Sequence, residues 1–241
     1  MAEAGGRPKV GIFTLSSCEG CIVQILNLED ELIDILKSID LVDCRVLGEK
    51  RDYDVLDVAI VEGAVMSEEE EKELRKIRER CKKLVALGDC ACHGGKFIVK
   101  DFGISEIRVK LPRGITAFRA DPLDRYVKVD YYVYGCPIDK EDFLTLLKDL
   151  LLGREYKPAS YNVCAECILK ENECLLEKGI PCLGPITRGG CKAVCPSNGR
   201  ECLGCRGPAE DTNVDSLIDI FRKHEIEIPE YIWSLIESMR R

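Results

Sequence analysis

The sequence contains few of the residues from which hydrolytic and nucleotide-binding sites are usually built. Among its 241 residues there are only two histidines, His93 and His224. A structural role is favoured over metal ligation for both of them. No Ser–His–Asp arrangement and no phosphate-binding loop is visible. The chain therefore offers no obvious site for bond-making chemistry of its own.

Long apolar runs and an excess of positive charge are also missing. Even apolar stretches such as residues 55–65 contain charges and are far shorter than the roughly 20 residues that span a bilayer. The formal net charge is −8, and Lys and Arg form no cluster on a predicted face, which argues against nucleic acid as a partner. Residues 1–9 carry no apolar or twin-arginine signal. We therefore expect a cytoplasmic protein that binds neither membrane nor nucleic acid.

Cysteine, in contrast, is abundant. The chain has 15 cysteines, seven of them in residues 1–163 and eight crowded into residues 164–205. In a secreted protein such a count would indicate disulfides. Without a secretion signal, metal ligation is the better interpretation.

The first part of the chain alternates between strand and helix patterns, which predicts an α/β fold. Short apolar runs predict strands at residues 10–15, 44–47, 56–61, 84–87 and 127–134. Apolar periodicity predicts a helix over residues 22–39, and capping residues predict two more, one opened by Ser67 with Glu70 and one by Asp139. Such an alternation is typical of a parallel sheet covered on both faces. A boundary is expected within residues 153–160, and two short helices, 214–224 and 229–239, close the chain.

Four cysteines of the first part follow the ends of predicted strands. Cys18 and Cys21 follow the first strand, Cys90 follows strand 84–87, and Cys136 follows strand 127–134. Because open α/β sheets place their sites along the carboxyl edge, these side chains are expected to converge. Four thiolates suit a 4Fe–4S cluster or a zinc ion, and the three strand-end motifs together favour iron–sulfur.

The eight later cysteines make two further sets of four. Their order is Cys164, Cys167, Cys174, Cys182, Cys191, Cys195, Cys202 and Cys205. The segment that carries them has too little apolar content to build a core, so metal ligation is expected to supply its folding energy. A pair of structural zinc sites remains an alternative. The uneven intervals and the Cys195-Pro196 step are more typical of ferredoxin cluster runs.

Three cysteines and one carboxylate remain to be interpreted. Cys44 and Cys81 are expected to be ordinary small buried residues. Cys92 competes with Cys90 as a ligand, and Cys90 is preferred because it directly follows the strand-end Gly-Asp pair. Glu62 ends strand 56–61 at the same edge. Its favoured role is to accept hydrogen bonds from backbone N–H groups, and the alternatives are a proton relay and an iron ligand in the oxidised cluster.

Taken together, these motifs resemble the small subunit of NiFe hydrogenases. The resemblance to the whole family is carried by Cys18-Glu19-Gly20-Cys21, Val61-Glu62-Gly63-Ala64, Gly88-Asp89-Cys90-Ala91-Cys92-His93-Gly94-Gly95 and Tyr134-Gly135-Cys136-Pro137. The resemblance to its cytoplasmic branch, which includes sulfhydrogenase delta chains and the small subunits of F420-linked and methyl-viologen-reducing hydrogenases, is carried by residues 184–191, Cys195-Pro196 and residues 202–207.

The resemblance implies three 4Fe–4S clusters and no hydrogen-splitting centre in this chain. It implies a flavodoxin-like domain, residues 1–155, with a proximal cluster, and a small loop-rich domain, residues 156–241, with two more. The implied proximal ligands are Cys18, Cys21, Cys90 and Cys136. The implied distal ligands are Cys164, Cys167, Cys174 and Cys182, and the implied medial ligands are Cys191, Cys195, Cys202 and Cys205.

The resemblance also implies partners. The nickel–iron centre would lie in a separate large subunit, and a flavin- or ferredoxin-like subunit would carry electrons to an NAD(P)-, F420- or sulfur-linked acceptor. Periplasmic relatives have a histidine at the distal cluster and three cysteines at the medial one. Here Cys164 and Cys195 complete both sets, and replacing imidazole with thiolate should lower a cluster's potential.

Two other functions compete with this interpretation. One is a respiratory-complex subunit of the same ancestry that passes electrons to a quinone. Such subunits carry only the N-terminal cluster, so the eight-cysteine segment argues against it. The other is a zinc-stapled interaction module without a redox role, which a colourless preparation would indicate.

Overall fold

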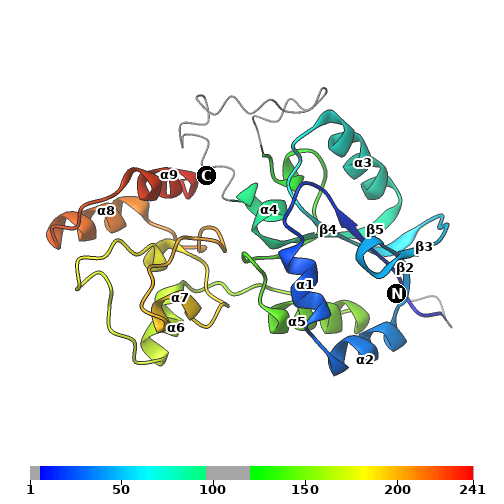
Figure 1. Ribbon diagram of the computed structural model, residues 1–241, viewed down its shortest axis with the longest axis horizontal. Helices are drawn as coiled ribbons and strands as arrows, with labels where there is room; N and C mark the ends of the chain where they lie inside the picture. The colour runs from blue at the N-terminus through cyan, green and yellow to red at the C-terminus, as the bar shows by residue number, and fades with distance from the viewer. Residues whose placement is uncertain (1–5, 96–119, 241) are drawn as a thin grey trace. The chain divides into compact units, whose positions relative to one another are not determined.

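A computed structural model describes residues 6–95 and 120–240 of the chain. The chain divides into two compact units (Figure 1). Unit 1 holds the described residues up to Lys157, and unit 2 begins at Pro158. Each unit has its own apolar core.

Unit 1 is built on a six-stranded sheet in the order β3-β2-β1-β4-β5-β6. The strands are β1 (Lys9–Thr14), β2 (Asp40–Cys44), β3 (Glu49–Lys50), β4 (Leu56–Glu62), β5 (Cys81–Leu87) and β6 (Tyr131–Val133). All neighbouring strands are parallel except β3, which pairs antiparallel with β2. The α/β class with a largely parallel sheet is therefore confirmed.

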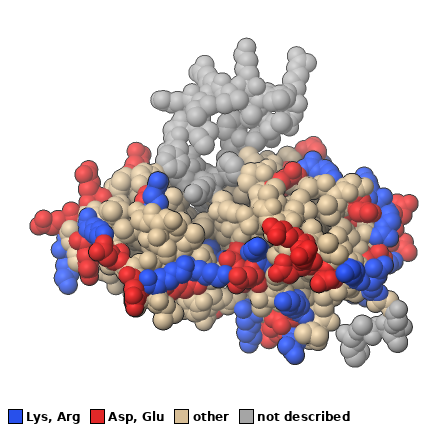
Figure 2. All heavy atoms as spheres, turned by 60° about the horizontal axis from the view of Figure 1, so that its bottom comes forward, with Lys and Arg blue, Asp and Glu red and all other residues tan. Residues whose placement is uncertain are grey.

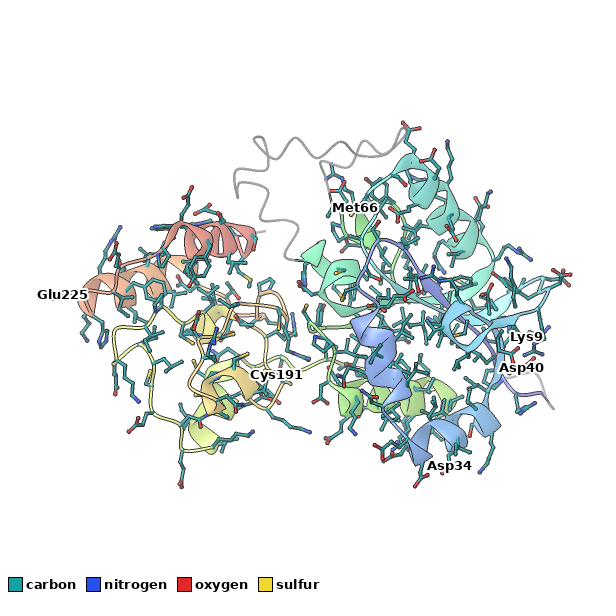
Figure 3. All side chains as sticks on the ribbon, viewed as in Figure 1. Lys9, Asp34, Asp40, Met66, Cys191 and Glu225 are labelled. Atoms are coloured by element: carbon teal, nitrogen blue, oxygen red, sulfur yellow. The ribbon has the colours of Figure 1, made fainter. Side chains whose placement is uncertain are left out.

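The register of the strands brings four of their carboxyl ends into line. Thr14 of β1 pairs with Glu62 of β4, Glu62 with Leu87 of β5, and Leu87 with Val133 of β6. The loops that follow these strands therefore leave the sheet at one edge. At the opposite end of the sheet, Lys9 of β1 pairs with Asp40 of β2, and both are labelled in Figure 3.

Helices cover both faces of this sheet. On one face, α1 (Gly20–Leu26), α2 (Asp30–Ser38) and α5 (Lys140–Leu151) pack on the buried residues Val58 and Ile60 of β4. On the other face, α3 (Glu68–Glu79) packs on Ala59 and Val61. The alternation along β4 follows from the two-residue period of a strand, and a strand buried on both faces reads as a continuous apolar run. A further short helix, α4 (Gly88–His93), begins directly after β5.

Local capping signals are confirmed in unit 1, but two predicted elements are wrong. Ser67 and Glu70 form a reciprocal capping box at the start of α3, and Asp139 caps α5. The helix predicted over residues 22–39 is two helices, because the chain turns at residues 27–29, where Leu28 is buried and Glu29 takes a left-handed φ of 53°. The strand predicted at residues 44–47 lies earlier, at β2, and residues 45–47 form a 3₁₀ turn.

Unit 2 contains the eight later cysteines and the C-terminal helices. Its elements are α6 (Val163–Leu169), a 3₁₀ turn at Gly184–Ile186, α7 (Val194–Ser197), α8 (Val214–Lys223) and α9 (Glu230–Ser238). The cysteine segment does not build a core alone but shares one with the helices that follow it. Leu183 and Ile186, from that segment, pack with Phe221 of α8 and with Ile232 and Ile236 of α9 in one buried cluster. The missing apolar residues are supplied by helices that follow the segment in sequence.

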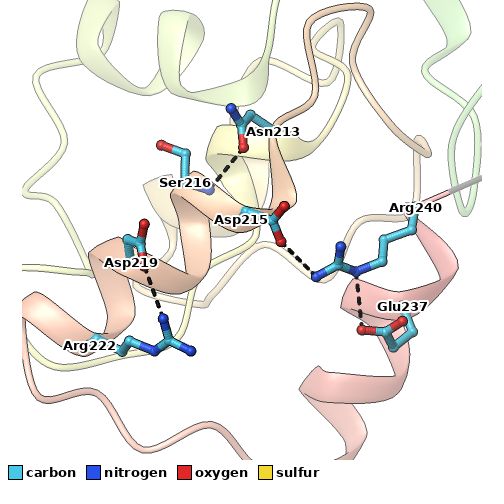
Figure 4. A network of polar contacts seen from close by, with 7 residues as sticks. All are labelled: Asn213, Asp215, Ser216, Asp219, Arg222, Glu237 and Arg240. Atoms are coloured by element: carbon cyan, nitrogen blue, oxygen red, sulfur yellow. Dashed lines mark hydrogen bonds and ion pairs between the residues drawn. The ribbon is translucent and has the colours of Figure 1, made fainter.

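Polar contacts join the two C-terminal helices at the surface (Figure 4). Asn213 caps α8 by accepting from the N–H of Ser216 at 2.9 Å, and Arg240 reaches back to Asp215 at 2.9 Å. Exposed ion pairs of this kind contribute little, at most about 1 kcal/mol each. The buried Phe221 and Ile236, rather than these pairs, hold α8 and α9 in unit 2.

On the face drawn in Figure 2, Lys and Arg side chains are interspersed with Asp and Glu. Within the described ranges 6–95 and 120–240, no helix is long and apolar enough to cross a bilayer.

Candidate metal centres

Three segments at the carboxyl edge of the sheet carry the four cysteines predicted for one site, Cys18, Cys21, Cys90 and Cys136. Asp89, in the first turn of α4, donates its N–H to the carbonyl of Gly135 at 2.8 Å, which joins the helix that carries Cys90 to the segment that carries Cys136. Cys18 lies in the β1–α1 loop, and Cys21 lies in the first turn of α1. The four cysteines that the sequence predicts for one site therefore come from three strand ends of one sheet edge.

Glycine makes room for sulfur at this edge. A Cβ added to Gly88 would lie 2.4 Å from Sγ of Cys21, and Gly88 has a φ of +82° that side chains rarely adopt. A Cβ added to Gly95 would lie 3.0 Å from Sγ of Cys90. These glycines allow the backbone to approach the cysteine sulfurs closely.

Burial raises the pKa of two of the four thiols, Cys90 and Cys21. Burial raises the pKa of Cys90 to about 12, and Asp89, Cys136 and Cys18 act in the same direction. Burial also raises the pKa of Cys21, and the charge of Glu62 raises it further. Metal binding requires the thiolate and stabilises it, so a metal at this site would displace the thiol protons.

Glu62 holds the loop that carries Cys21. Its carboxylate, only 2 % exposed, accepts hydrogen bonds from the backbone N–H groups of Cys21 and Ile22, each at 3.2 Å. These are the first free donors of α1, and α1 has no side-chain cap of its own. The carboxylate of Glu62, at the end of β4, thus caps α1. This is the structural role that the sequence favours for Glu62.

The cysteines left outside the predicted ligand sets are buried. Cys44 and Cys81 lie in the two cores of unit 1. Cys92 is also buried, and its thiol lies 3.5 Å from the carbonyl oxygen of Ala86 and 3.7 Å from that of Val133. Cys92 therefore faces the core while Cys90 interacts with Cys18 and Cys136, which supports the preference for Cys90. His93 contacts Asp89 at 3.2 Å and stacks on Tyr134.

In unit 2, the cysteines predicted for the distal set are close enough for their charges to affect the pKa of one of them, Cys164. Burial raises the pKa of Cys164 to about 12, and the charges of Cys182, Cys167 and Cys174 raise it further. A Cβ added to Gly184 would lie 3.3 Å from Sγ of Cys164 and 3.5 Å from Sγ of Cys182. This glycine leaves the space between two predicted ligands of one cluster open.

Of the four cysteines predicted for the medial set, Cys202 and Cys205 interact, and Cys202 also contacts the distal set. Burial raises the pKa of Cys202, and the charges of Cys182 and Cys205 act in the same direction. The backbone N–H of Cys202 also donates to Sγ of Cys182 at 3.3 Å, so the two sets are adjacent. Cys191, labelled in Figure 3, is joined to α7 by the hydrogen bond from the N–H of Val194 to its carbonyl at 3.3 Å. Cys195 lies on α7 itself, exposed to solvent.

The donor set bears on the choice of metal. A structural zinc is held by four sulfurs about 2.3 Å from one centre. In a cubane cluster each thiolate binds a different iron. Four cysteine thiolates per set therefore fit a 4Fe–4S cluster, and they fit a zinc ion as well. Among the residues that the structure describes, no three histidine, cysteine or carboxylate side chains converge on a point that could hold a single metal ion.

Two charged residues of unit 2 were not predicted from the sequence. Glu166 lies between Cys164 and Cys167 and accepts hydrogen bonds from the N–H groups of Gly190 and Ala193. Arg206 follows Cys205 and is one of the largest fully buried side chains, at 1 % exposure. Their positions next to cysteines were visible in the sequence, but their burial and partners depend on tertiary packing.

Comparison with known proteins identifies the family. Residues 18–150 match the family described as NADH ubiquinone oxidoreductase, 20 Kd subunit. The chain is 39% identical over 219 residues to the Sulfhydrogenase 2 subunit delta of Pyrococcus furiosus, covering 89% of this chain and 92% of that protein. It is 30% identical to the G chain of the F420-non-reducing hydrogenase vhu of Methanocaldococcus jannaschii, covering 93% of this chain and 92% of that protein.

A crystal structure agrees with the sequence matches. A chain of the NAD+-reducing [NiFe]-hydrogenase in the H2-reduced state superposes with a TM-score of 0.51 at 26% identity, covering 64% of this chain and 96% of that one. The protein therefore belongs to the family of the NADH ubiquinone oxidoreductase 20 Kd subunit. Within that family it is the small, electron-transfer subunit of a NiFe hydrogenase, part of a complex that includes a large subunit.

Proposed function

We propose that this subunit carries three 4Fe–4S clusters and relays electrons one at a time between the nickel–iron centre of the large subunit and a soluble redox partner. The proximal cluster is assigned to Cys18, Cys21, Cys90 and Cys136. The distal cluster is assigned to Cys164, Cys167, Cys174 and Cys182, and the medial cluster to Cys191, Cys195, Cys202 and Cys205. A single observation carries the proposal: three strand ends, aligned by the sheet register, lead into the segments that carry the four cysteines at one edge of the sheet.

The same proposal assigns domains. The parallel strand order β2-β1-β4-β5-β6 is that of flavodoxin-like sheets. Residues 1–155 would form this flavodoxin-like domain and residues 156–241 the domain of the other two clusters. A cytoplasmic location and a flavin- or ferredoxin-like partner subunit remain predictions from the sequence.

The protein groups have defined tasks in this relay. Glu62 fixes the backbone at Cys21 through two hydrogen bonds, and Gly88 admits the sulfur of Cys21. The N–H of Cys202 donates to the Cys182 sulfur, and such bonds to ligand sulfurs tune cluster potentials. The clusters would supply the one-electron redox chemistry, and this chain would supply their spacing, burial and charge environment.

The proposal is tested on the complex purified anaerobically from its native source. We expect about twelve iron and twelve acid-labile sulfide per copy of this chain, the sum of three 4Fe–4S clusters after subtraction of iron in other subunits. The chain itself, released from the complex, should show no hydrogen oxidation. Stoichiometric zinc with little iron in this subunit would overturn the cluster assignment.

A further inference from the structure

The loop that carries Cys191 is held between a carboxylate and a guanidinium in unit 2. On one side, Glu166 accepts hydrogen bonds from the N–H groups of Gly190 at 2.8 Å and Ala193 at 3.1 Å. Its Oε2 lies 3.8 Å from Sγ of Cys191. On the other side, Arg206 donates from Nε to the carbonyl of the residue before Gly190, at 2.5 Å. Two opposite charges therefore flank one predicted cluster ligand.

Arg206 is the more deeply placed of the two charged residues. Its side chain is 1 % exposed, and a guanidinium remains protonated in proteins. Its Nη2 would lie 2.5 Å from a Cβ added to Gly190, the residue before Cys191, and Gly190 has a φ of +99°. Arg206 also directly follows Cys205 in the chain. The structure thus reserves a buried space for this cation beside two predicted ligands of one cluster.

Burying a charge is costly unless opposite charge lies nearby. A cubane held by four thiolates is an anion, and it gains one more negative charge on reduction. A fixed cation in a low-dielectric interior stabilises the reduced form more than the oxidised form, and a fixed anion does the reverse.

We propose that Arg206 is a positioning residue of the electron relay, whose buried charge raises the reduction potential of the medial cluster, while Glu166 lowers it from the opposite side of the same loop. The inference rests on the proposed assignment of Cys191, Cys195, Cys202 and Cys205 to that cluster. The charge of Arg206 acts on the cluster potential in the direction opposite to that of the ligand set. Complete thiolate ligation lowers a cluster's potential, and a buried arginine offsets that effect, so that the medial cluster stays reducible by its neighbours.

Three variants of the assembled complex test the inference. Arg206→Gln keeps an N–H donor for the backbone carbonyl and removes the charge, whereas Arg206→Lys keeps the charge and changes the donor geometry. Glu166→Gln keeps an acceptor and removes the negative charge. The readouts are iron content and the midpoint potential of the medial cluster from an EPR-monitored redox titration at one pH. Cys191→Ser identifies which EPR signal belongs to the medial cluster.

With iron content unchanged, Arg206→Gln should lower the equilibrium constant for reduction at least tenfold, which is about 59 mV for a one-electron couple. Arg206→Lys should stay within that range of the wild type, and Glu166→Gln should shift the potential upward. Because a merely structural role would not follow the sign of the removed charge, opposite shifts support the inference.

Unchanged potentials in Arg206→Gln and Glu166→Gln, or shifts of the same sign, would overturn it. If Arg206→Gln loses iron, the other two variants decide. An upward shift of the potential in Glu166→Gln together with a wild-type potential in Arg206→Lys supports the inference. An unchanged potential in Glu166→Gln overturns it. A Cys191→Ser complex that keeps all its iron and all its EPR signals would instead overturn the ligand assignment in the proposed function.

Discussion

The carboxylate of Glu62, the last residue of β4, accepts a hydrogen bond from the backbone N–H of Cys21 at 3.2 Å. The two residues are 41 positions apart in sequence and meet because the ends of β1 and β4 are paired in parallel register. A second bond, from the N–H of Ile22, completes the contact. A buried strand-end carboxylate therefore fixes the conformation of a predicted cluster loop.

Substituting Glu62 should first affect stability. Glu62→Ala leaves two buried N–H groups without their acceptor, at a cost of about 1–3 kcal/mol each, so we expect a lower melting temperature of the complex. Glu62→Gln keeps one acceptor oxygen and should lose less. The measurements are thermal unfolding, turnover and the EPR signal of the proximal cluster.

The matched control is Asp57→Asn on the same strand, whose carboxylate accepts a hydrogen bond from the backbone N–H of Lys9 at 2.8 Å, at the opposite end of the sheet. A Glu62→Gln complex of normal stability that has lost turnover would show a proton-relay role instead. A proximal EPR signal that changes only on oxidation would show a redox-dependent ligand.

The architecture of unit 1 could be predicted from the sequence because its signals are local. Continuous apolar runs mark strands buried on both faces, and Ser67 and Asp139 mark helix starts within one turn of their partners. The break between α1 and α2 could not be predicted, because it depends on Leu28 finding a buried position that only the folded sheet provides.

Unit 2 shows why the rest could not be predicted. Its core joins Leu183 to Phe221 and Ile236, which are separated by loops without periodicity. The cysteine positions were visible as ligand candidates from spacing alone. The burial of Arg206 was not, because an arginine beside a cysteine is usually a solvated surface residue and its 1 % exposure appears only after packing.

A matched pair of cysteines tests the proximal ligand set. Cys90→Ser should remove or convert the proximal cluster, with a loss of up to about four iron per chain. Cys92→Ser should keep all the iron, because Cys92 is 4 % exposed in the core and a serine hydroxyl can donate to the same carbonyl groups of Ala86 and Val133. Iron analysis and EPR of both complexes provide the comparison, and iron loss from Cys92→Ser alone would reverse the assignment.

Gly88→Ala should prevent assembly of the proximal cluster. The new methyl group would lie 2.4 Å from Sγ of Cys21, and the φ of +82° adds about 1–2 kcal/mol of backbone strain. Gly153→Ala is the control, since it has a φ of +67° in the same unit with nothing within 4 Å. We expect iron loss only in Gly88→Ala, as measured by metal analysis. Equal iron content in the two variants would show that the close approach to sulfur is not needed.

The core of unit 2 can be weakened without touching a cysteine. Phe221 is fully buried, and Phe221→Ala should destabilise this unit by about 3–5 kcal/mol. The proximal cluster of unit 1 should remain, whereas the signals of the other two clusters weaken on mild heating. Trp233→Ala, at a position that is 38% exposed, is the matched aromatic control and should change neither. Parallel loss of all three signals in Phe221→Ala would show that the two units do not unfold separately.

Cys202→Ser tests the relay itself. Cys202 is buried and the charge of Cys205 acts on it, so replacing its thiol should remove or convert the medial cluster, while the backbone N–H that donates to the Cys182 sulfur is kept. Because α8 and α9 provide unit 2 with an apolar core, the unit should stay folded and the complex assembled. Hydrogen–deuterium exchange, which needs only the nickel–iron centre of the large subunit, should continue near its normal rate. Hydrogen-driven reduction of the physiological acceptor should fall at least tenfold, since electrons cannot pass beyond the proximal cluster. If both activities fell together in an assembled complex, or if neither fell, the relay role of the unit 2 cysteines would be wrong.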